Sequence, residues 1–156
     1  MLNVYESLLA EADQEGLITK EKNLLANDGL IVGNRIAIRH DLTWKEKGCV
    51  MAEELGHYYT SSGNILDQDD VSNRQQELKA RAWAYDKRIG LTGLIRAYKN
   101  GCKNRYEIAD YLDVTEEFLD ECLVYYRNQY GICTRVDNYV IYFEPHLWTA
   151  DMNFRT

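Results

Sequence analysis

One short segment of the sequence contains side chains whose types and spacing could bind a metal ion and hydrolyse a peptide bond. In the zinc helix motif His-Glu-x-x-His, the two histidines lie one turn apart and bind the metal, while the glutamate acts as general base. Here the same register reads Glu53-Glu54-Leu55-Gly56-His57. Glu54 has the position of the base and His57 that of the second ligand. Glu53 replaces the first histidine, and a carboxylate can also bind zinc. A glutamate pair is also typical of a solvated helix face.

A third ligand is available further along the chain. A catalytic zinc site typically has three protein ligands and leaves a fourth position for water. Glu77 follows His57 by twenty residues and lies in a predicted second helix, Gln75–Lys87. Ala80 and Ala84 fall on the same stripe of that helix as Glu77, and their small side chains would allow close approach to the motif helix. The spacing therefore predicts two ligand helices packed together.

The two segments AEELGHYYTS and ELKARAWAYDK together resemble the ImmA/IrrE family of small gluzincin-like metallopeptidases. Members occur in phages, integrative elements and bacterial genomes. The third ligand of that family lies in a Glu-x-x-Ala segment, which Glu77–Ala80 matches, and the resemblance covers residues 15–90 well. It implies a divalent metal, zinc or alternatively manganese, held by His57, Glu77 and Glu53. Glu53 departs from the family pattern.

These residues would support metal-assisted peptide hydrolysis. A bound cation lowers the pKa of its water from near 16 towards ~7, and Glu54 would take the proton and pass it to the departing amine. A carboxylate in place of an imidazole adds negative charge at the ion and favours harder ions such as manganese. Four further residues could stabilise the transition state. They are Tyr58, Tyr59, Tyr85 and, just before the motif helix, His40.

The resemblance also implies a partner. It suggests a helix-turn-helix repressor of a phage or mobile element, which the protein would cleave or otherwise disable. A protein that binds such a repressor without cutting it is the alternative, because the altered motif could be a relic. Direct binding of nucleic acid is not expected, because the net charge is -7 and affinity for nucleic acid depends on Lys and Arg neutralising phosphates. Residues 104–128 have the rhythm of a helix-turn-helix, but the second helix is acidic.

Length and composition predict one domain in a reducing cytoplasm, and the resemblance implies that this is the cytoplasm of a bacterial host cell. The chain has 156 residues, of which 46% are hydrophobic, enough for one core. We expect a single domain over 1–156, with a metallopeptidase-like core at 1–90 and a helical subregion with a terminal hairpin at 91–156. No apolar stretch is long enough for a membrane helix, and the N-terminus is too acidic for a signal peptide. The four cysteines show no paired spacing, which favours reduced thiols.

The pattern of elements predicts a mainly helical α+β fold of zincin type. Helices are expected at residues 3–13 and 20–26, followed by a small hairpin at 30–32 and 35–39. Thr43 and Glu46 form a capping box that predicts the motif helix from Trp44 to about Tyr59. A helix break at 61–64 and a loop at 66–73 precede the second ligand helix, capped at Ser72.

The C-terminal part is expected to contain a helix pair and a hairpin. The first helix ends near Leu112, a turn follows at Asp113-Val114, and Thr115 caps a helix to about Asn128. The alternating residues 131–145 around Asp137-Asn138 predict the hairpin. The remaining histidine, His146, is expected at the surface.

Overall fold

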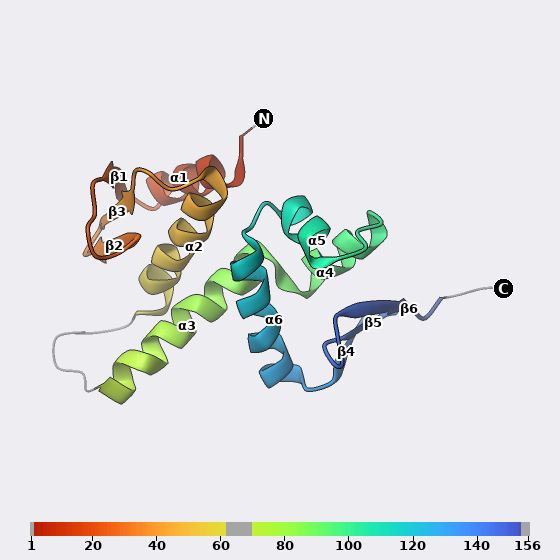
Figure 1. The fold of residues 1–156 in the computed structure, drawn as a ribbon. Coiled ribbons are helices and arrows are strands. Elements are labelled where there is room, and N and C mark those ends of the chain that lie inside the picture. The colour runs from red at the N-terminus through yellow and green to blue at the C-terminus, as the bar shows by residue number, and fades with distance from the viewer. Residues whose placement is uncertain (1, 62–69, 154–156) are drawn as a thin grey trace. The chain divides into compact units, whose positions relative to one another are not determined.

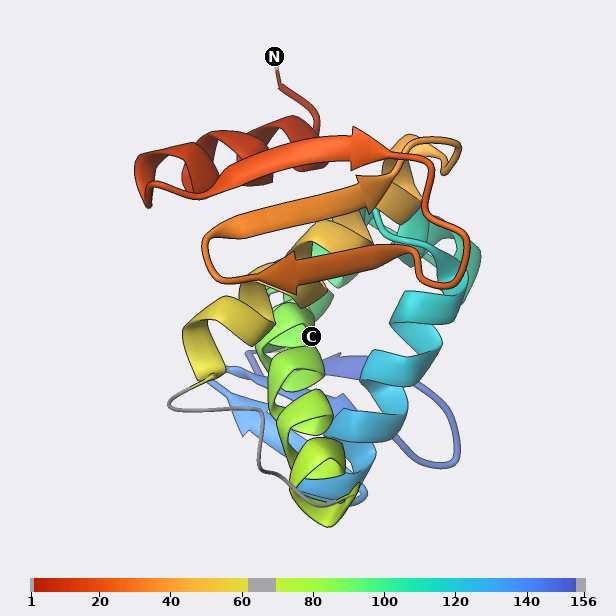
Figure 2. The same cartoon turned by 90° about the vertical axis from the view of Figure 1, so that its left-hand side faces the viewer.

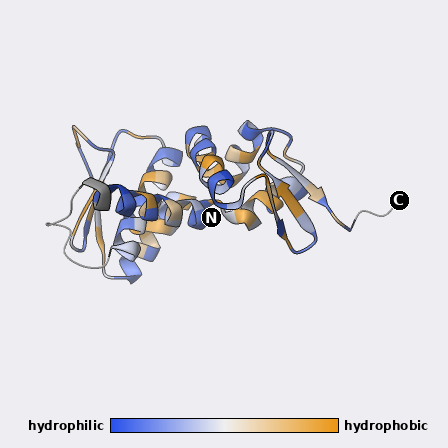
Figure 3. Cartoon of the chain, turned by 90° about the horizontal axis from the view of Figure 1, so that it is seen from below, coloured by the Kyte–Doolittle hydropathy of each residue, from blue (hydrophilic) through white to orange (hydrophobic). Residues whose placement is uncertain are grey.

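The computed structural model describes residues 2–61 and 70–153, which form two compact units, Met1–Lys87 and Arg88–Thr156. Each unit combines helices with a three-stranded sheet, so the protein is α+β and mainly helical, as predicted (Figure 1). The units divide close to the predicted boundary between residues 90 and 91, and the single domain over 1–156 stays a prediction. The helices carry hydrophilic and hydrophobic residues in alternating stripes (Figure 3), as amphipathic helices do.

The N-terminal unit consists of a sheet with helices on one face. Its elements are α1 (Val4–Gln14), β1 (Ile18–Lys22), β2 (Gly29–Val32), β3 (Arg35–Arg39), α2 (Trp44–Thr60) and α3 (Asp70–Arg88). The strand order is β1-β3-β2, with β3 parallel to β1 and antiparallel to β2. Figure 2 looks onto this sheet, with β3 in the middle and α1 and α2 behind it. The β2–β3 pairing confirms the predicted hairpin.

The core of this unit is formed by the alternating residues of β3 and the apolar stripes of the helices. Ile36 and Ile38 of β3 are buried, whereas Arg35 and Arg39 point to the opposite face. Met51 and Leu55 of α2 are fully buried. Side chains of a strand alternate between faces, so one face of the sheet packs on helices.

The predicted capping box determines where α2 begins. Thr43 Oγ1 accepts a hydrogen bond from the Glu46 backbone N–H at 3.2 Å, and the Thr43 N–H donates to Glu46 Oε1 at 3.1 Å. A helix start leaves four backbone N–H groups without partners in the helix. Here two of them, those of Thr43 and Glu46, are hydrogen-bonded by the two side chains. This confirms the predicted start at Trp44 and fixes the rotation of the motif residues.

Two expected local elements are wrong. The helix predicted at 20–26 is not formed, because its first three residues belong to β1, and the pairing of β1 with β3 outweighs the helix propensity of Lys20–Lys22. The second ligand helix begins at Asp70, so Ser72 lies inside α3 and is not its cap. Of the predicted break at 61–64 and the predicted loop at 66–73, residues 62–64 and 66–69 lie outside the described residues, whereas residues 70–73 belong to α3, so the loop is wrong there.

A buried lysine connects α1, β1 and α2. Lys47 Nζ donates to Glu21 Oε1 at 2.8 Å, and the Tyr5 hydroxyl donates to Glu21 Oε2 at 3.0 Å. The hydrogen bond from Lys47 lowers the pKa of Glu21, while burial raises that of Tyr5. Trp44 lies 4.9 Å from Lys47 Nζ and adds a cation–π contact. This cluster fixes the first half of α2 against the sheet.

The C-terminal unit contains three helices and an antiparallel sheet. Its elements are α4 (Gly90–Lys99), α5 (Arg105–Leu112), α6 (Glu116–Tyr130), β4 (Cys133–Val136), β5 (Tyr139–Tyr142) and β6 (Trp148–Asp151). The predicted helix pair, its turn at Asp113 in the left-handed region, and the Thr115 cap are confirmed. The β4–β5 hairpin is confirmed as well, while α4 and β6 were not expected. Tyr126, Leu119 and Ile141 are fully buried in this unit.

No helix among the described residues combines the length and the apolar composition that crossing a membrane requires.

Candidate active site in the N-terminal unit

Helices α2 and α3 approach each other closely at a glycine and an alanine. A Cβ atom on Gly56 would overlap the carbonyl group of Ala80, whose Cα would lie 3.1 Å away. One turn further along α2, the ring of Tyr59 stacks on Trp83 of α3 with centroids 5.0 Å apart. Small residues let two helix backbones meet. The predicted packing of the two ligand helices is therefore present.

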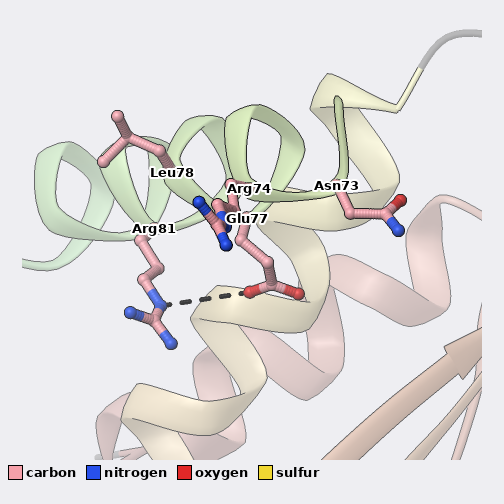
Figure 4. Close-up of a pocket in the computed structure, with 5 residues that line it drawn as sticks. All are labelled: Asn73, Arg74, Glu77, Leu78 and Arg81. Carbon is pink, nitrogen blue, oxygen red and sulfur yellow. Dashed lines mark ion pairs between the residues drawn. The ribbon is translucent and has the colours of Figure 1, made fainter. Parts of the chain in front are cut away.

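This close approach joins His57 and Glu77. His57 Nε2 lies 3.3 Å from Glu77 Oε1, with 26% of the His57 side chain and 55% of the Glu77 side chain exposed. The other carboxylate oxygen of Glu77 lies 4.0 Å from Arg81 Nε on the next turn of α3. Figure 4 shows Glu77 and Arg81 on the side of α3 that faces α2, with Leu78 pointing away. Glu77 thus lies between an imidazole and a guanidinium.

Glu54 is buried beside this pair. Its residue is only 9% exposed, and burial raises the pKa of its carboxyl to about 7, with the charges of Glu53 and Glu77 adding to the effect. The backbone of β2 covers it, because a Cβ atom on Gly29 would lie 2.8 Å from Glu54 Oε1 and 2.5 Å from Val50 Cγ1. Desolvation disfavours the charged form of a carboxylate. Glu54 therefore exchanges its proton near neutral pH.

An open cleft of about 710 Å³ brings these side chains together. It lies between β2, the turn after it, the end of α2 and the start of α3. Its lining residues are Asn27, Gly29, Leu30, Ile31, Gly33, Glu54, His57, Tyr58, Ser61, Asn73, Gln76 and Glu77. A second, shallower hollow on the adjoining side of α3 is lined by Glu77, Arg81 and three neighbours (Figure 4). A concave site with a perturbed carboxyl is typical of a functional centre.

The His57–Glu77 pair has the separation of two metal ligands. Zinc bonds to imidazole nitrogen and carboxylate oxygen are about 2.0–2.2 Å long, so two ligands at corners of a tetrahedron lie roughly 3.3–3.5 Å apart. The observed 3.3 Å matches this value. Among residues 2–61 and 70–153, however, no three His, Cys, Asp or Glu side chains gather as a ligand set. Glu53 is half-buried and does not join the pair, so the donors fit two positions of a metal site.

The family model of the IrrE N-terminal-like domain, Peptidase_M78, matches residues 4–123. The chain belongs to this family. Searches of the curated proteins and of the solved structures found no significant match. As a member of a metallopeptidase family, the protein is metallopeptidase-like, and the match includes α2, α3 and the whole cleft.

Within this IrrE N-terminal-like domain, two of the residues predicted to stabilise the transition state, Tyr58 and His40, lie in different places. Tyr58 lines the cleft with Glu54 and His57. His40 is exposed at the end of β3, before α2 begins, and its charge acts on Glu21 and Asp41 instead. Of the expected transition-state groups, only Tyr58 therefore lines the cleft.

The two remaining tyrosines have packing roles. Tyr59 stacks on Trp83 and meets Tyr58 edge-on at 5.0 Å. Tyr85 is 4% exposed, within the core. Neither lines the cleft.

Several cleft residues of this domain were missed by the sequence reasoning. Gly29 closes over Glu54, and three amides, Asn27, Asn73 and Gln76, line the cleft. In the sequence, Gly29 directly precedes the strand predicted at 30–32, which gave no sign that this glycine touches the motif helix. Asn73 and Gln76 lie three residues apart on α3, on the same stripe as Glu77 and Ala80, so helical periodicity could have found them.

Proposed function

We propose that the cleft hydrolyses peptide bonds with the help of a divalent cation, zinc or alternatively manganese, held by His57 and Glu77. The observation that carries this proposal is Glu54, a buried carboxyl with a pKa of about 7, in one cleft with an imidazole and a carboxylate at the distance of two ligands. A general base is most effective when its pKa lies near the working pH. Glu53, on the same face of α2 one turn before His57, remains the candidate for the third ligand.

The chain's own residues account for the proton transfers. A bound cation would act as a Lewis acid and lower the pKa of a water molecule. Glu54 in its ionised form accepts the proton of the attacking water. It then donates that proton to the leaving amine, which a carboxyl with a pKa near 7 can do at neutral pH. Tyr58, which lines the same cleft, would donate a hydrogen bond to the oxygen that gains negative charge.

The proposed substrate is a helix-turn-helix repressor of a phage or mobile genetic element, in the cytoplasm of a bacterial host. Its support is the family to which the chain belongs. The cleft is open and 710 Å³ in volume, and its polar lining of amides could bind the backbone groups of an extended peptide. An extended segment offers unpaired N–H and C=O groups, which amide side chains can satisfy.

The alternative is an anti-repressor that acts by binding alone. One observation favours it, namely that no third donor joins His57 and Glu77 within the described residues. In that case Glu77 would serve as the ion-pair partner of His57 and Arg81, and the cleft would hold a repressor segment without cutting it.

The experiment that separates the two functions uses Glu54→Gln. The variant keeps the size of the side chain and the metal-binding pair, but it cannot accept a proton. Wild type and variant are mixed with the helix-turn-helix regulator encoded beside the protein, and fragment formation and operator release are followed. We expect wild type to cut and the variant to bind without cutting, with a rate loss of roughly 10²–10⁴-fold. Full derepression by Glu54→Gln, with no fragment from wild type, would establish the binding function instead.

A further inference from the structure

The two faces of the β1-β3-β2 sheet differ in composition. The register places Ile18, Arg35 and Val32 side by side in one row, and Lys20 and Leu30 in the next, on the face opposite the buried Ile36 and Ile38. Lys22 follows on the same face at the end of β1. We call the six residues Ile18, Lys20, Lys22, Leu30, Val32 and Arg35 the outer groove. Here aliphatic and basic side chains alternate.

The apolar members of the outer groove are strongly exposed. Val32 is 67% exposed, Ile18 46% and Leu30 45%. Together with their neighbours they enclose a hollow of about 270 Å³. In Figure 2 this face of the sheet is turned to the viewer, and α1 and α2 lie behind it. Clustered exposed aliphatic side chains around a hollow are typical of an interaction surface.

The charge of the outer groove is opposite to that of the chain. Lys20, Lys22 and Arg35 contribute three positive charges in a protein of net charge -7, and none of the three forms an ion pair or side-chain hydrogen bond with any residue that the structure describes. Glu21, which lies between the two lysines in sequence, points to the other face, where Tyr5 and Lys47 bind it. At the edge of the same face, Arg39 lies beside Lys22 and pairs with Asp28 and Asp41, so these two carboxylates are engaged by Arg39 and leave Lys20, Lys22 and Arg35 without an ion-pair partner among the described residues.

We propose that the outer groove docks an acidic, amphipathic segment of a partner protein, with its aliphatic side chains in the hollow and its carboxylates on Lys20, Lys22 and Arg35. Because the groove is positively charged, charge complementarity requires a negatively charged partner segment. Single-stranded nucleic acid fits less well, because such sites stack bases on aromatic rings and the apolar groove residues are aliphatic. A hollow also suits a convex helix better than the flat surface of a membrane.

The outer groove adjoins the cleft of the candidate active site. Leu30 lines both, since it belongs to β2, the strand that covers Glu54. A segment docked in the groove would bring the chain that flanks it to the cleft. The groove can nevertheless bind its partner without any hydrolysis, so the proposal does not depend on the catalytic one.

A designed peptide tests the docking directly. The probe is a fluorescent helical peptide of Glu, Leu and Ala with one apolar face, and its counterpart has Lys in place of Glu. Binding is measured by anisotropy for wild type, Lys20→Glu/Lys22→Glu and the matched control Lys79→Glu/Lys103→Glu, which changes the net charge equally at exposed sites outside the groove. A second pair compares Val32→Ser with Leu25→Ser, which alters an exposed leucine outside the groove.

We expect the acidic peptide to bind wild type, and to bind roughly tenfold more weakly to the groove variants than to their controls. Added salt should weaken this binding, because it screens exposed charges. Circular dichroism of each variant checks that the fold is kept. Equal binding by groove and control variants, or stronger binding of the lysine peptide, overturns the proposal.

Two further measurements exclude other occupants. Flotation with phosphatidylserine vesicles would reveal a membrane surface, and analytical ultracentrifugation would reveal a second copy of this chain. The proposal is overturned if the acidic peptide does not bind wild type, and if wild type instead binds vesicles or self-associates in a way that Lys20→Glu/Lys22→Glu abolishes. The membrane surface or the second copy is then the occupant of the groove.

Discussion

At the scale of single residues, the burial of Glu54 connects the proposed chemistry with the stability of the fold. Its carboxyl has a pKa of about 7 in the folded protein against 4.5 for an unperturbed glutamate. Between these two pH values the folded state holds the proton more tightly than the unfolded state does. The free energy of unfolding therefore falls as the pH rises from about 4.5 to 7, and the loss is complete above pH 7.

Replacing Glu54 by glutamine should remove this loss. A difference of 2.5 pH units corresponds to at most about 3 kcal/mol, so Glu54→Gln should be more stable than wild type at pH 8 and gain little at pH 4.5. Urea unfolding with a chelator present at both pH values gives the comparison. Asp13→Asn, a change at an exposed carboxylate, serves as control. A gain for Glu54→Gln that is the same at both pH values would mean that Glu54 ionises normally.

The site was predictable from the sequence where its residues follow helical periodicity. Glu54, His57 and Glu77 all line the cleft, and Glu77 lies 3.3 Å from His57, as the predicted packing of the two helices requires, although the predicted start of the second helix was wrong. The role of Gly29 was not predictable, since its contact with Glu54 depends on how a strand crosses a helix. The position of Glu53 relative to this pair likewise depends on side-chain directions, which spacing alone does not specify.

At the scale of elements, the two glycines of α2 have opposite roles. Gly56 lies against the backbone of Ala80, whereas a Cβ atom on Gly48 would find its nearest neighbour, the Tyr5 nitrogen, 3.7 Å away. Glycine lowers helix stability by about 1 kcal/mol relative to alanine wherever nothing else requires it. The same substitution should therefore act in opposite directions at the two positions of one helix.

We expect Gly48→Ala to stabilise the protein by about 0.5–1 kcal/mol. Gly56→Ala should destabilise it by about 1–3 kcal/mol, because α2 and α3 must move apart. The movement should also separate His57 from Glu77, so Gly56→Ala should lose affinity for metal while Gly48→Ala keeps it. Thermal unfolding and metal titration of both variants provide the measurements. An unchanged melting temperature for Gly56→Ala would show that the helices do not touch there.

Helices and strands were predicted well where capping residues mark their ends, and poorly where pairing with a distant strand determines the structure. The Thr43–Glu46 capping box specified the start of α2, and the Thr115 cap that of α6. The helix predicted at 20–26 was wrong because the polar sequence of its first residues resembles a helix, and only pairing with β3 makes residues 18–22 a strand. Strand β6 was missed because its four residues carry little alternation of their own.

At the scale of the whole molecule, the family match spans both compact units. It covers residues 4–123, from α1 through the first half of α6, whereas the cleft and the outer groove use only residues of the N-terminal unit. Composition and charge indicated the broad class of the protein, and the helix-turn-helix rhythm at 104–128 corresponds to a real helix pair. The two units divide close to the predicted boundary between residues 90 and 91, although no linker marks it in the sequence.

Whether His57 and Glu77 hold a divalent cation in the cleft can be measured by calorimetric titration of chelator-treated protein with Zn²⁺ and Mn²⁺. We expect about one cation per chain for wild type and for Glu54→Gln, none for His57→Ala or Glu77→Ala, and weaker binding for Glu53→Ala. Wild type that binds neither ion, or His57→Ala that binds as well as wild type, would contradict the account.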